Sequence, residues 1–417
     1  MKNEKWPGLA LGLWLGCAWV MSADNIPDHW NFAFAPANPP SSGMVTVETT
    51  NEYESGQAWG FDPRFPTHSL PGGGVTADQP FYFSAMLPEG NYRVTVGLGS
   101  AEEASTNTIK AEARRLMLEN LVTQPGQVKH ISFVVNIRTP EYPGGHVHLK
   151  TRELTSEQVT WDRALTLEFN GSHPVIQSLE IAPARHVTTI YLAGDSTVCD
   201  QPLEPWNSWG QMLPRFFNDQ VAVANYAESG ESLRSSLASH RFDKIFSRIQ
   251  PGDYLFVQFG HNDMKDKAPD ALERYSTNLK KVVEEARAHG AIPVLVTSME
   301  RKAGVQRPTL AGYPDAVRSV SRECGTALID LNRSSVELYR ALGPDLGRAF
   351  QDGTHHNNYG SYELAQCVVT GIRKNVPALA AFLDPALPVF NPARPDPASL
   401  FHLPESPLHD SRKPEGN

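Results

Sequence analysis

The stretch Val187-Thr-Thr-Ile-Tyr-Leu-Ala193, followed at once by Gly194-Asp-Ser-Thr197, decides the fold of the second half of the chain. Its first part is an apolar run of strand length, and its second part has the composition of a sharp turn. In an open α/β sheet, functional side chains lie at the carboxyl ends of the strands. We therefore expect Ser196 at that edge, with its hydroxyl exposed and its backbone N–H unpaired.

Strands and helices continue to alternate after this stretch. Further strands are expected at 254–259, 292–297 and 327–331, and helices at 209–217, 270–289, 313–324 and 359–374. Repeated strand–helix order predicts a parallel sheet with helices on both faces, here over residues 186–383. The remaining residues, 384–417, are polar and rich in proline, and we expect a mobile tail.

The residues before Val187 have a different pattern. Strands are expected at 81–87, 92–96, 130–137, 165–169 and 175–181, with Asn170-Gly171 as the turn between the last two. Residues 101–121 are expected to form one helix or a long loop. Several strands without a long helical pattern predict a smaller all-β sandwich domain over residues 24–185.

The composition excludes several classes of protein. Of the 417 residues, 40% are hydrophobic. Lysine and arginine number 37 and aspartate and glutamate 46, which gives a net charge of −9 and a pI near 5.9. Such a mix does not fit a collagen-like, coiled-coil or wholly disordered chain. The acidic pI also argues against a protein whose whole surface binds nucleic acid, although it leaves room for a local basic patch, and no nucleic-acid partner is expected.

The first 23 residues have the pattern of a secretory signal peptide. Lys2 and Lys5 precede an apolar run that ends at Ala23, the expected cleavage site. A membrane anchor is the alternative, but the run is short and carries glycines. Lipid attachment at Cys17 is disfavoured because Trp14 stands where a lipobox has leucine. We therefore expect a secreted or periplasmic protein without a membrane partner after cleavage.

The cysteines give no framework for a disulfide-rich or zinc-binding fold. Cleavage after Ala23 would leave Cys199, Cys324 and Cys367. Because three is odd, at least one thiol is free or pairs between chains. The sequence does not fix the oligomeric state.

Two segments together have the composition of a serine nucleophile with its base. Serine needs a base that takes its proton, and the base needs a carboxylate on its other nitrogen. Asp352-Gly-Thr-His355 supplies both, because a spacing of three residues in a turn lets Asp352 reach the imidazole. His356 is adjacent, but the spacing favours His355. The plainer alternative is a capping aspartate and a surface histidine.

Three donors for an oxyanion are expected beside this serine. Asn262, in Gly260-His-Asn-Asp263, follows a predicted strand and carries a side-chain N–H₂ group. Gly230 can bring a bare backbone N–H close to a ligand, and the N–H of Ser196 is the third. Asp195 and Gly260 are expected to support these loops. Taken singly, each segment reads as an ordinary turn, but together they supply nucleophile, base, orienting carboxylate and donors.

These blocks resemble the SGNH hydrolases, also called the GDSL family. Within that superfamily the closest resemblance is to the rhamnogalacturonan acetylesterases, carried by Tyr191-Leu-Ala-Gly-Asp-Ser-Thr197, Val257-Gln-Phe-Gly-His-Asn-Asp263 and Asp352-Gly-Thr-His355. The resemblance spans about residues 187–375 and implies a flavodoxin-like sheet sandwiched by helices. The turn after His355 departs from the family pattern. Trp30-Asn-Phe-Ala-Phe34 and Trp59-Gly-Phe-Asp62 resemble, more weakly, a galactose-binding-like β-sandwich.

The resemblance implies a serine esterase that removes acetyl groups from a plant cell-wall polysaccharide, above all pectic rhamnogalacturonan, through an acetyl-serine intermediate. The predicted signal peptide adds that this esterase is secreted. The resemblance implies no cofactor and no metal. Pectic rhamnogalacturonan carries carboxylates, so Arg234 and Arg301 are expected to bind substrate. The alternatives are a xylan acetylesterase, an SGNH esterase or lipase for other acyl groups, and a glycan-binding protein with an inert hydrolase domain.

Overall fold

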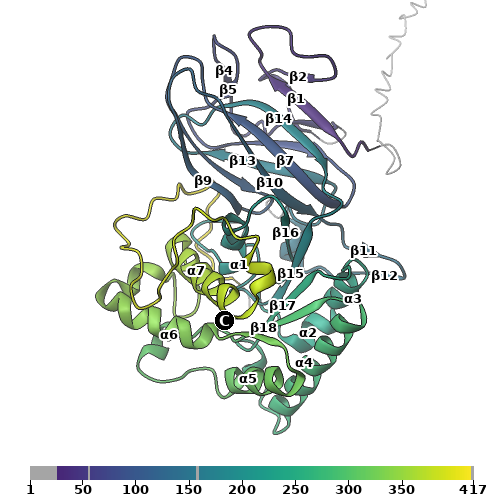
Figure 1. Ribbon diagram of the computed structural model, residues 1–417, viewed down its shortest axis with the longest axis vertical. Coiled ribbons are helices and arrows are strands. Elements are labelled where there is room, and N and C mark those ends of the chain that lie inside the picture. Colours follow the sequence, from purple (N-terminus) through teal and green to yellow (C-terminus); the bar gives the residue numbers. More distant parts are fainter. Residues whose placement is uncertain (1–25, 55–56, 156–158, 415–417) are drawn as a thin grey trace, which may run out of the picture.

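The structure is a computed structural model that describes residues 26–54, 57–155 and 159–414. The predicted signal peptide and its cleavage site lie outside the described residues. Figure 1 shows an all-β part, formed by the first half of the chain, lying against a part in which helices surround a central sheet. No helix among the described residues has both the length and the apolarity needed to cross a bilayer.

The first part is a sandwich of two sheets with an aromatic core. One sheet has the order β10 (Lys129–Ile137), β7 (Gly90–Leu98), β14 (Ile176–Pro183), β1 (Trp30–Phe34), β2 (Val45–Val47), with β4 (His68–Ser69) and β5 (Val75–Thr76) beside it. The other has the order β3 (Trp59–Phe61), β6 (Phe81–Met86), β13 (Ala164–Asn170), β8 (Ser105–Ala111), β9 (Arg115–Thr123). Phe32 and Phe34 of the first sheet meet Phe83 of the second edge to face, with ring centroids 5.2 and 5.1 Å apart. This geometry is favourable for aromatic pairs, so these rings hold the two sheets together.

The second part is a parallel sheet with helices on both faces, as the alternating pattern predicts. Its order is β16 (Val221–Asn225), β15 (Thr188–Gly194), β17 (Tyr254–Gln258), β18 (Ile292–Val296), β19 (Ala327–Ile329), with every pair parallel. The α-helices are α1 (Trp209–Met212), α2 (Leu233–Ala238), α3 (Arg241–Phe246), α4 (Ala271–Ala288), α5 (Tyr313–Cys324), α6 (Leu331–Leu342), α7 (Asn358–Asn375) and α8 (Pro377–Ala380). Short 3₁₀ helices are η2 (Thr151–Leu154), η3 (Leu213–Phe216), η4 (Asp263–Lys265), η5 (Lys302–Val305) and η6 (Gly343–Ala349).

Alternate residues of β15 explain why both faces of the parallel sheet are covered. Ile190 and Leu192 pack in a core shared with α1, α6 and α7, whereas Tyr191 and Ala193 pack in a second core with α2 to α5. Side chains of successive strand residues point to opposite faces, so a run that is apolar at every position needs a helical layer on each side. Helices thereby cover both faces of the sheet, and the carboxyl ends of its strands carry the loops that are described below.

The expectation of a helix or loop over residues 101–121 is wrong. Most of this stretch forms strands β8 and β9 of a hairpin, whose turn places Glu112 and Arg114 at φ +56° and +66°. The stretch contains good helix formers, but Lys110 and Arg115 are buried against the second part of the chain. These tertiary contacts outweigh the helical propensity of a few residues, each worth only tenths of a kcal/mol.

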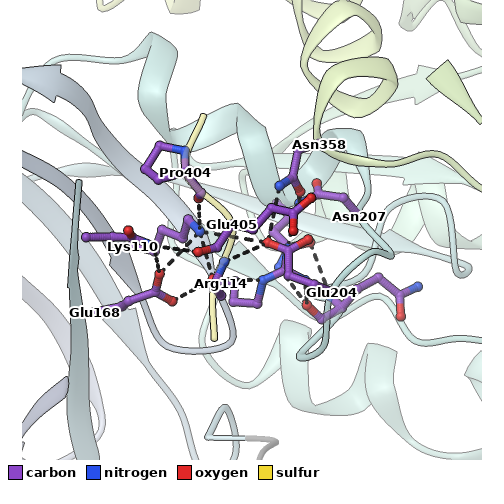
Figure 2. A network of polar contacts seen from close by, with 12 residues as sticks. Lys110, Arg114, Glu168, Glu204, Asn207, Asn358, Pro404 and Glu405 are labelled. Atoms are coloured by element: carbon purple, nitrogen blue, oxygen red, sulfur yellow. Dashed lines mark hydrogen bonds and ion pairs between the residues drawn. The ribbon is translucent and has the colours of Figure 1, made fainter. Parts of the chain in front are cut away.

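The expectation of a mobile tail after residue 383 is also wrong. The amide N–H of Asp410 donates to the Glu204 carbonyl at 2.8 Å, and Ser406 is fully buried. Figure 2 shows the tail passing Lys110, which donates to the Pro404 carbonyl at 2.8 Å. A proline-rich stretch without periodicity does not indicate in the sequence that it packs on the rest of the protein. Its backbone carbonyls can nevertheless accept from buried charged groups where the two parts meet, as the Pro404 carbonyl does from Lys110.

The three described cysteines are free, and Cys199 and Cys367 are buried. At least one thiol that is free or pairs between chains was expected, and all three of these are free.

Candidate active site

Ser196 lies in the turn after β15, at the carboxyl edge of the parallel sheet. The amide groups of Val198 and Cys199 both donate to the Asp195 carbonyl at 3.0 Å and close this turn. Gly194 is required at its start, because a Cβ there would lie 2.6 Å from Cγ2 of Val198. The strand and this tight turn therefore fix the position of the serine.

The structure brings Ser196, His355 and Asp352 together in one line of hydrogen bonds. Nε2 of His355 lies 2.8 Å from the Ser196 hydroxyl oxygen, and Nδ1 lies 2.9 Å from Oδ2 of Asp352. With a proton assigned to Nδ1, the ring donates to the carboxylate and accepts from the serine. The serine is only 4% exposed, so the expectation of an exposed hydroxyl is wrong. Its hydroxyl pairs with the imidazole instead.

Asp352 is held as a carboxylate. Burial opposes its charge, but the His355 ring and the backbone N–H groups of His355 and Thr354 outweigh burial and lower its pKa. These two amides donate to Oδ1 at 2.7 and 2.6 Å, leaving Oδ2 for the ring. A carboxylate in this position orients the imidazole and stabilises its charged form. The spacing between Asp352 and His355 thus produces the geometry that the sequence predicted.

The three expected oxyanion donors have the freedom that such donors need. Among the described residues, no acceptor pairs with the backbone N–H of Ser196 or of Gly230. Nδ2 of Asn262 donates one hydrogen to the Glu231 carbonyl at 2.9 Å, and an N–H₂ group carries a second. This single bond joins the loop of Asn262 to the loop of Gly230. Gly230 has φ +77°, a conformation that favours glycine.

Asp195 and His261 form a buried support beneath the nucleophile. Oδ1 of Asp195 accepts from the amide and hydroxyl of Thr197, and Oδ2 lies 3.2 Å from Nδ1 of His261. Burial opposes the charge of Asp195, but His261 and Thr197 outweigh it and lower the pKa of this carboxyl. Nε2 of His261 lies 3.0 Å from the Met299 carbonyl. Asp195 thus contacts Thr197 and His261 rather than His355, and the supporting role expected of it stays a prediction.

Gly260 also lies where a side chain does not fit. It has φ +150°, and a Cβ there would approach the Ser298 hydroxyl to 2.8 Å. The supporting role expected of Gly260 stays a prediction.

The two predicted substrate-binding arginines differ in their surroundings. Arg301 is occupied by protein acceptors: its Nε donates to Thr354 at 3.1 Å, and its Nη2 to the His261 carbonyl at 3.3 Å. It therefore connects the loops of His261 and His355. The side chain of Arg234 is 76% exposed beside a groove of about 670 Å³ that Asn262 also lines. Arg234 is thus the arginine with the freedom to meet a ligand.

Besides His261, sequence reasoning missed two further residues at this site. Nε2 of Gln201 donates to the Ser196 carbonyl at 2.9 Å and to the Ser229 hydroxyl at 3.2 Å, so it joins two of the loops. The indole ring of Trp206 meets the His355 ring edge to face at 5.7 Å. Both lie in an irregular segment with no periodicity, and no spacing could have identified them.

The described residues contain no group of three or more side chains placed to hold a metal ion. The chemistry that the site offers is nucleophilic attack by a serine with a histidine base. The acceptor of such an attack is a carbonyl carbon, and the oxyanion donors for its oxygen stay a prediction.

Comparison with protein families gives a match over residues 192–361 to the GDSL-like lipase/acylhydrolase family. The matched range begins within β15 and ends after His355. It therefore includes Ser196, Gly230, Asn262 and Asp352, which the sequence motifs had singled out.

Two curated proteins of Bacillus subtilis (strain 168) are similar to this chain. Rhamnogalacturonan acetylesterase RhgT is 34% identical over 207 residues, which cover 44% of this chain and 89% of the relative. The uncharacterized esterase YxiM is 26% identical over 375 residues, which cover 84% of this chain and 91% of the relative. The crystal structure of YxiM covers 83% of this chain and 98% of its own, at 24% identity and a TM-score of 0.44.

Proposed function

This chain belongs to the GDSL-like lipase/acylhydrolase family, and from that premise we propose that it removes O-acetyl groups from a plant cell-wall polysaccharide. The observation that carries the proposal is the line of hydrogen bonds from Ser196 through His355 to Asp352. A serine in this arrangement is an activated nucleophile, and esters are the usual substrates of such a site.

In the proposed reaction, Oγ of Ser196 attacks the acetyl carbonyl carbon while Nε2 of His355 takes the hydroxyl proton. The carbonyl oxygen becomes negative and accepts from the N–H groups of Ser196, Gly230 and Asn262. When the C–O bond to the sugar breaks, His355 returns the proton to the sugar oxygen. The acetyl group then remains on Ser196.

Water completes the cycle by the same route. His355 takes a proton from water as the water oxygen attacks the acetyl-serine carbonyl. The bond to Oγ breaks, His355 returns its proton to Ser196, and the product leaves as acetic acid, which loses its remaining proton to water and becomes acetate. Asp352 orients His355 throughout and stabilises its charged form.

Pectic rhamnogalacturonan is the substrate that we favour. The relative at 34% identity is named a rhamnogalacturonan acetylesterase. Binding a polymer of carboxylates to a chain of net charge −9 needs local cations. Arg234 and Lys265 supply them beside Asn262, since Nζ of Lys265 lies 2.9 Å from Oδ1 of that asparagine.

We also propose that the protein acts outside the cytoplasm. The basic start and apolar run of residues 1–23 support this location. A polysaccharide of the plant cell wall is too large to enter a cell, so an enzyme that deacetylates it has to act outside.

The test is acetate release from acetylated rhamnogalacturonan and from acetylated xylan, with parent, Ser196→Ala and Ser132→Ala proteins. Ser132 is an exposed serine of β10 and is the matched control. We expect release mainly from rhamnogalacturonan, abolished only in Ser196→Ala. Preference for xylan would overturn the substrate, and release that survives Ser196→Ala would overturn the site.

A further inference from the structure

One long excursion of the β-sandwich lies along the second part of the chain. We call residues 138–163 the strap, of which 138–155 and 159–163 are described. The strap leaves β10, forms the hairpin β11 (Glu141–Tyr142) and β12 (Gly145–His146) and the helix η2, and returns to β13. Its His148 amide donates to the Ser239 carbonyl at 3.0 Å, and Nζ of Lys244 donates to the Glu141 carbonyl at 2.5 Å. These bonds hold the strap to α2 and α3.

A buried carboxylate fixes the strap at η2. Glu153 is 3% exposed and accepts from Nη1 of Arg241 at 3.0 Å, where Arg241 belongs to α3. The same carboxylate accepts from the Lys150 amide and the Trp161 indole, both at 2.9 Å. A buried ion pair with further hydrogen bonds to its carboxylate holds a fixed geometry. The backbone of Lys150 is therefore well placed.

The side chain of Lys150 reaches from the strap into the loop of the oxyanion donors. Its Nζ donates to the Ser229 carbonyl at 2.5 Å and lies 3.2 Å from Oε1 of Glu231. Ser229 immediately precedes Gly230, and the Glu231 carbonyl accepts from Asn262. A cation of the β-sandwich thus contacts the same peptide group that carries the Gly230 N–H.

The planarity of that peptide links the direction of the Ser229 carbonyl to the direction of the Gly230 N–H. In a trans peptide the C=O and N–H point in opposite directions, so a carbonyl held by Lys150 turns the Gly230 N–H to the other side. Gly230 has φ +77° and no side chain, so without a clamp the backbone has other conformations open to it. An ammonium on the carbonyl also polarises the amide and strengthens hydrogen bonds that its N–H donates.

We propose that Lys150 is a positioning residue, which fixes and polarises the Ser229–Gly230 peptide so that its N–H binds the oxyanion of the reaction. The inference rests on the proposed place of Gly230 among the oxyanion donors. It gives the β-sandwich a part in the chemistry in addition to any binding of glycan. One missing oxyanion donor lowers kcat by about 10²- to 10³-fold, so loss of a residue that acts through a donor should cost about 10- to 100-fold.

The test compares Lys150→Met, Lys150→Arg and Lys150→Gln with the parent on 4-nitrophenyl acetate, a substrate without a sugar. Lys374→Met, at an exposed lysine near the end of α7, is the matched control. Phenylboronic acid, which forms a tetrahedral adduct on an active serine, is the second readout. We expect Lys150→Met to lower kcat by about 10- to 100-fold with KM little changed, and to weaken boronate inhibition by a similar factor. Lys150→Arg should recover most of both.

The remaining outcomes contradict either the inference on Lys150 or the proposed function. Unchanged kcat in Lys150→Met would overturn the inference, and so would a loss of kcat with unchanged boronate affinity. If Lys150→Met does not fold, Lys150→Gln takes its place, because its side chain is polar but uncharged and one atom shorter than that of lysine. A parent that fails to hydrolyse 4-nitrophenyl acetate, or a Ser196→Ala protein that still does, would overturn the proposed function instead.

Discussion

Replacing His356 with glutamine should remove a large part of the acid sensitivity of this protein. His356 is buried next to His355, and its Nε2 lies 2.9 Å from the Tyr339 hydroxyl, which we assign as the donor. Burial, followed by the neighbouring imidazoles of His355 and His261, lowers the pKa of His356 to about 3. An unfolded histidine has a pKa of about 6.5. Between these values the unfolded chain holds a proton that the folded chain lacks.

The sign and size of the effect follow from linkage. The neutral ring contributes its full stability above about pH 6.5, and that contribution falls by about 1.4 kcal/mol for each pH unit below it. From pH 7 to pH 5 the loss is about 2 kcal/mol. Glutamine does not titrate, so the His356→Gln variant lacks this loss. The free energy of unfolding of the parent minus that of the variant should therefore fall by about 2 kcal/mol from pH 7 to pH 5.

Urea unfolding of both proteins at several pH values between 5 and 7 measures this difference. Other titrating groups, such as Asp263, whose pKa burial raises to about 7, act equally on both proteins and cancel. Two stability curves that stay parallel over this range would refute the reasoning. They would mean that His356 is protonated in the folded protein or that its site opens to water.

Three further changes test other parts of the structure. Arg114→Met leaves the buried Glu204 without its closest cation, so urea unfolding should show a loss of about 3–5 kcal/mol, and a loss below about 1 kcal/mol would contradict a structural role for this pair. Asn262→Ala should lower kcat on 4-nitrophenyl acetate by about 10²- to 10³-fold with little change in KM; an unchanged kcat would remove the side chain from the oxyanion donors. Ending the chain after residue 383 removes Ser406 from its buried contacts with Lys110, and thermal unfolding should occur at a lower temperature. An unchanged unfolding temperature would show that the docked tail adds no stability.

The sequence predicted those features that depend on local pattern. The apolar run before Gly194 predicted the buried strand β15, and the spacing of Asp352 and His355 predicted their hydrogen bond. The hydrogen bond joins residues near in sequence, and the strand is marked by a local apolar run although its partner strands lie further along the chain. The alternation of strands and helices similarly predicted the parallel sheet.

Features that depend on distant partners were missed. Residues 105–123 form strands because Lys110 and Arg115 find buried partners, among them Glu168 and Asp200, which lie far along the chain. The tail docks for the same reason. Gln201 and Lys150 donate to backbone carbonyls of the loops around the site, and no pattern in the sequence marks such contacts.

The most direct test of the account is to label the protein with a fluorophosphonate, which reacts with activated serines, and to locate the adduct by peptide mass spectrometry. The account predicts one adduct, on Ser196, formed much more slowly in His355→Ala because the base is lost. An adduct on another residue, or no adduct in a protein that hydrolyses 4-nitrophenyl acetate, would contradict the assignment of Ser196 as the nucleophile.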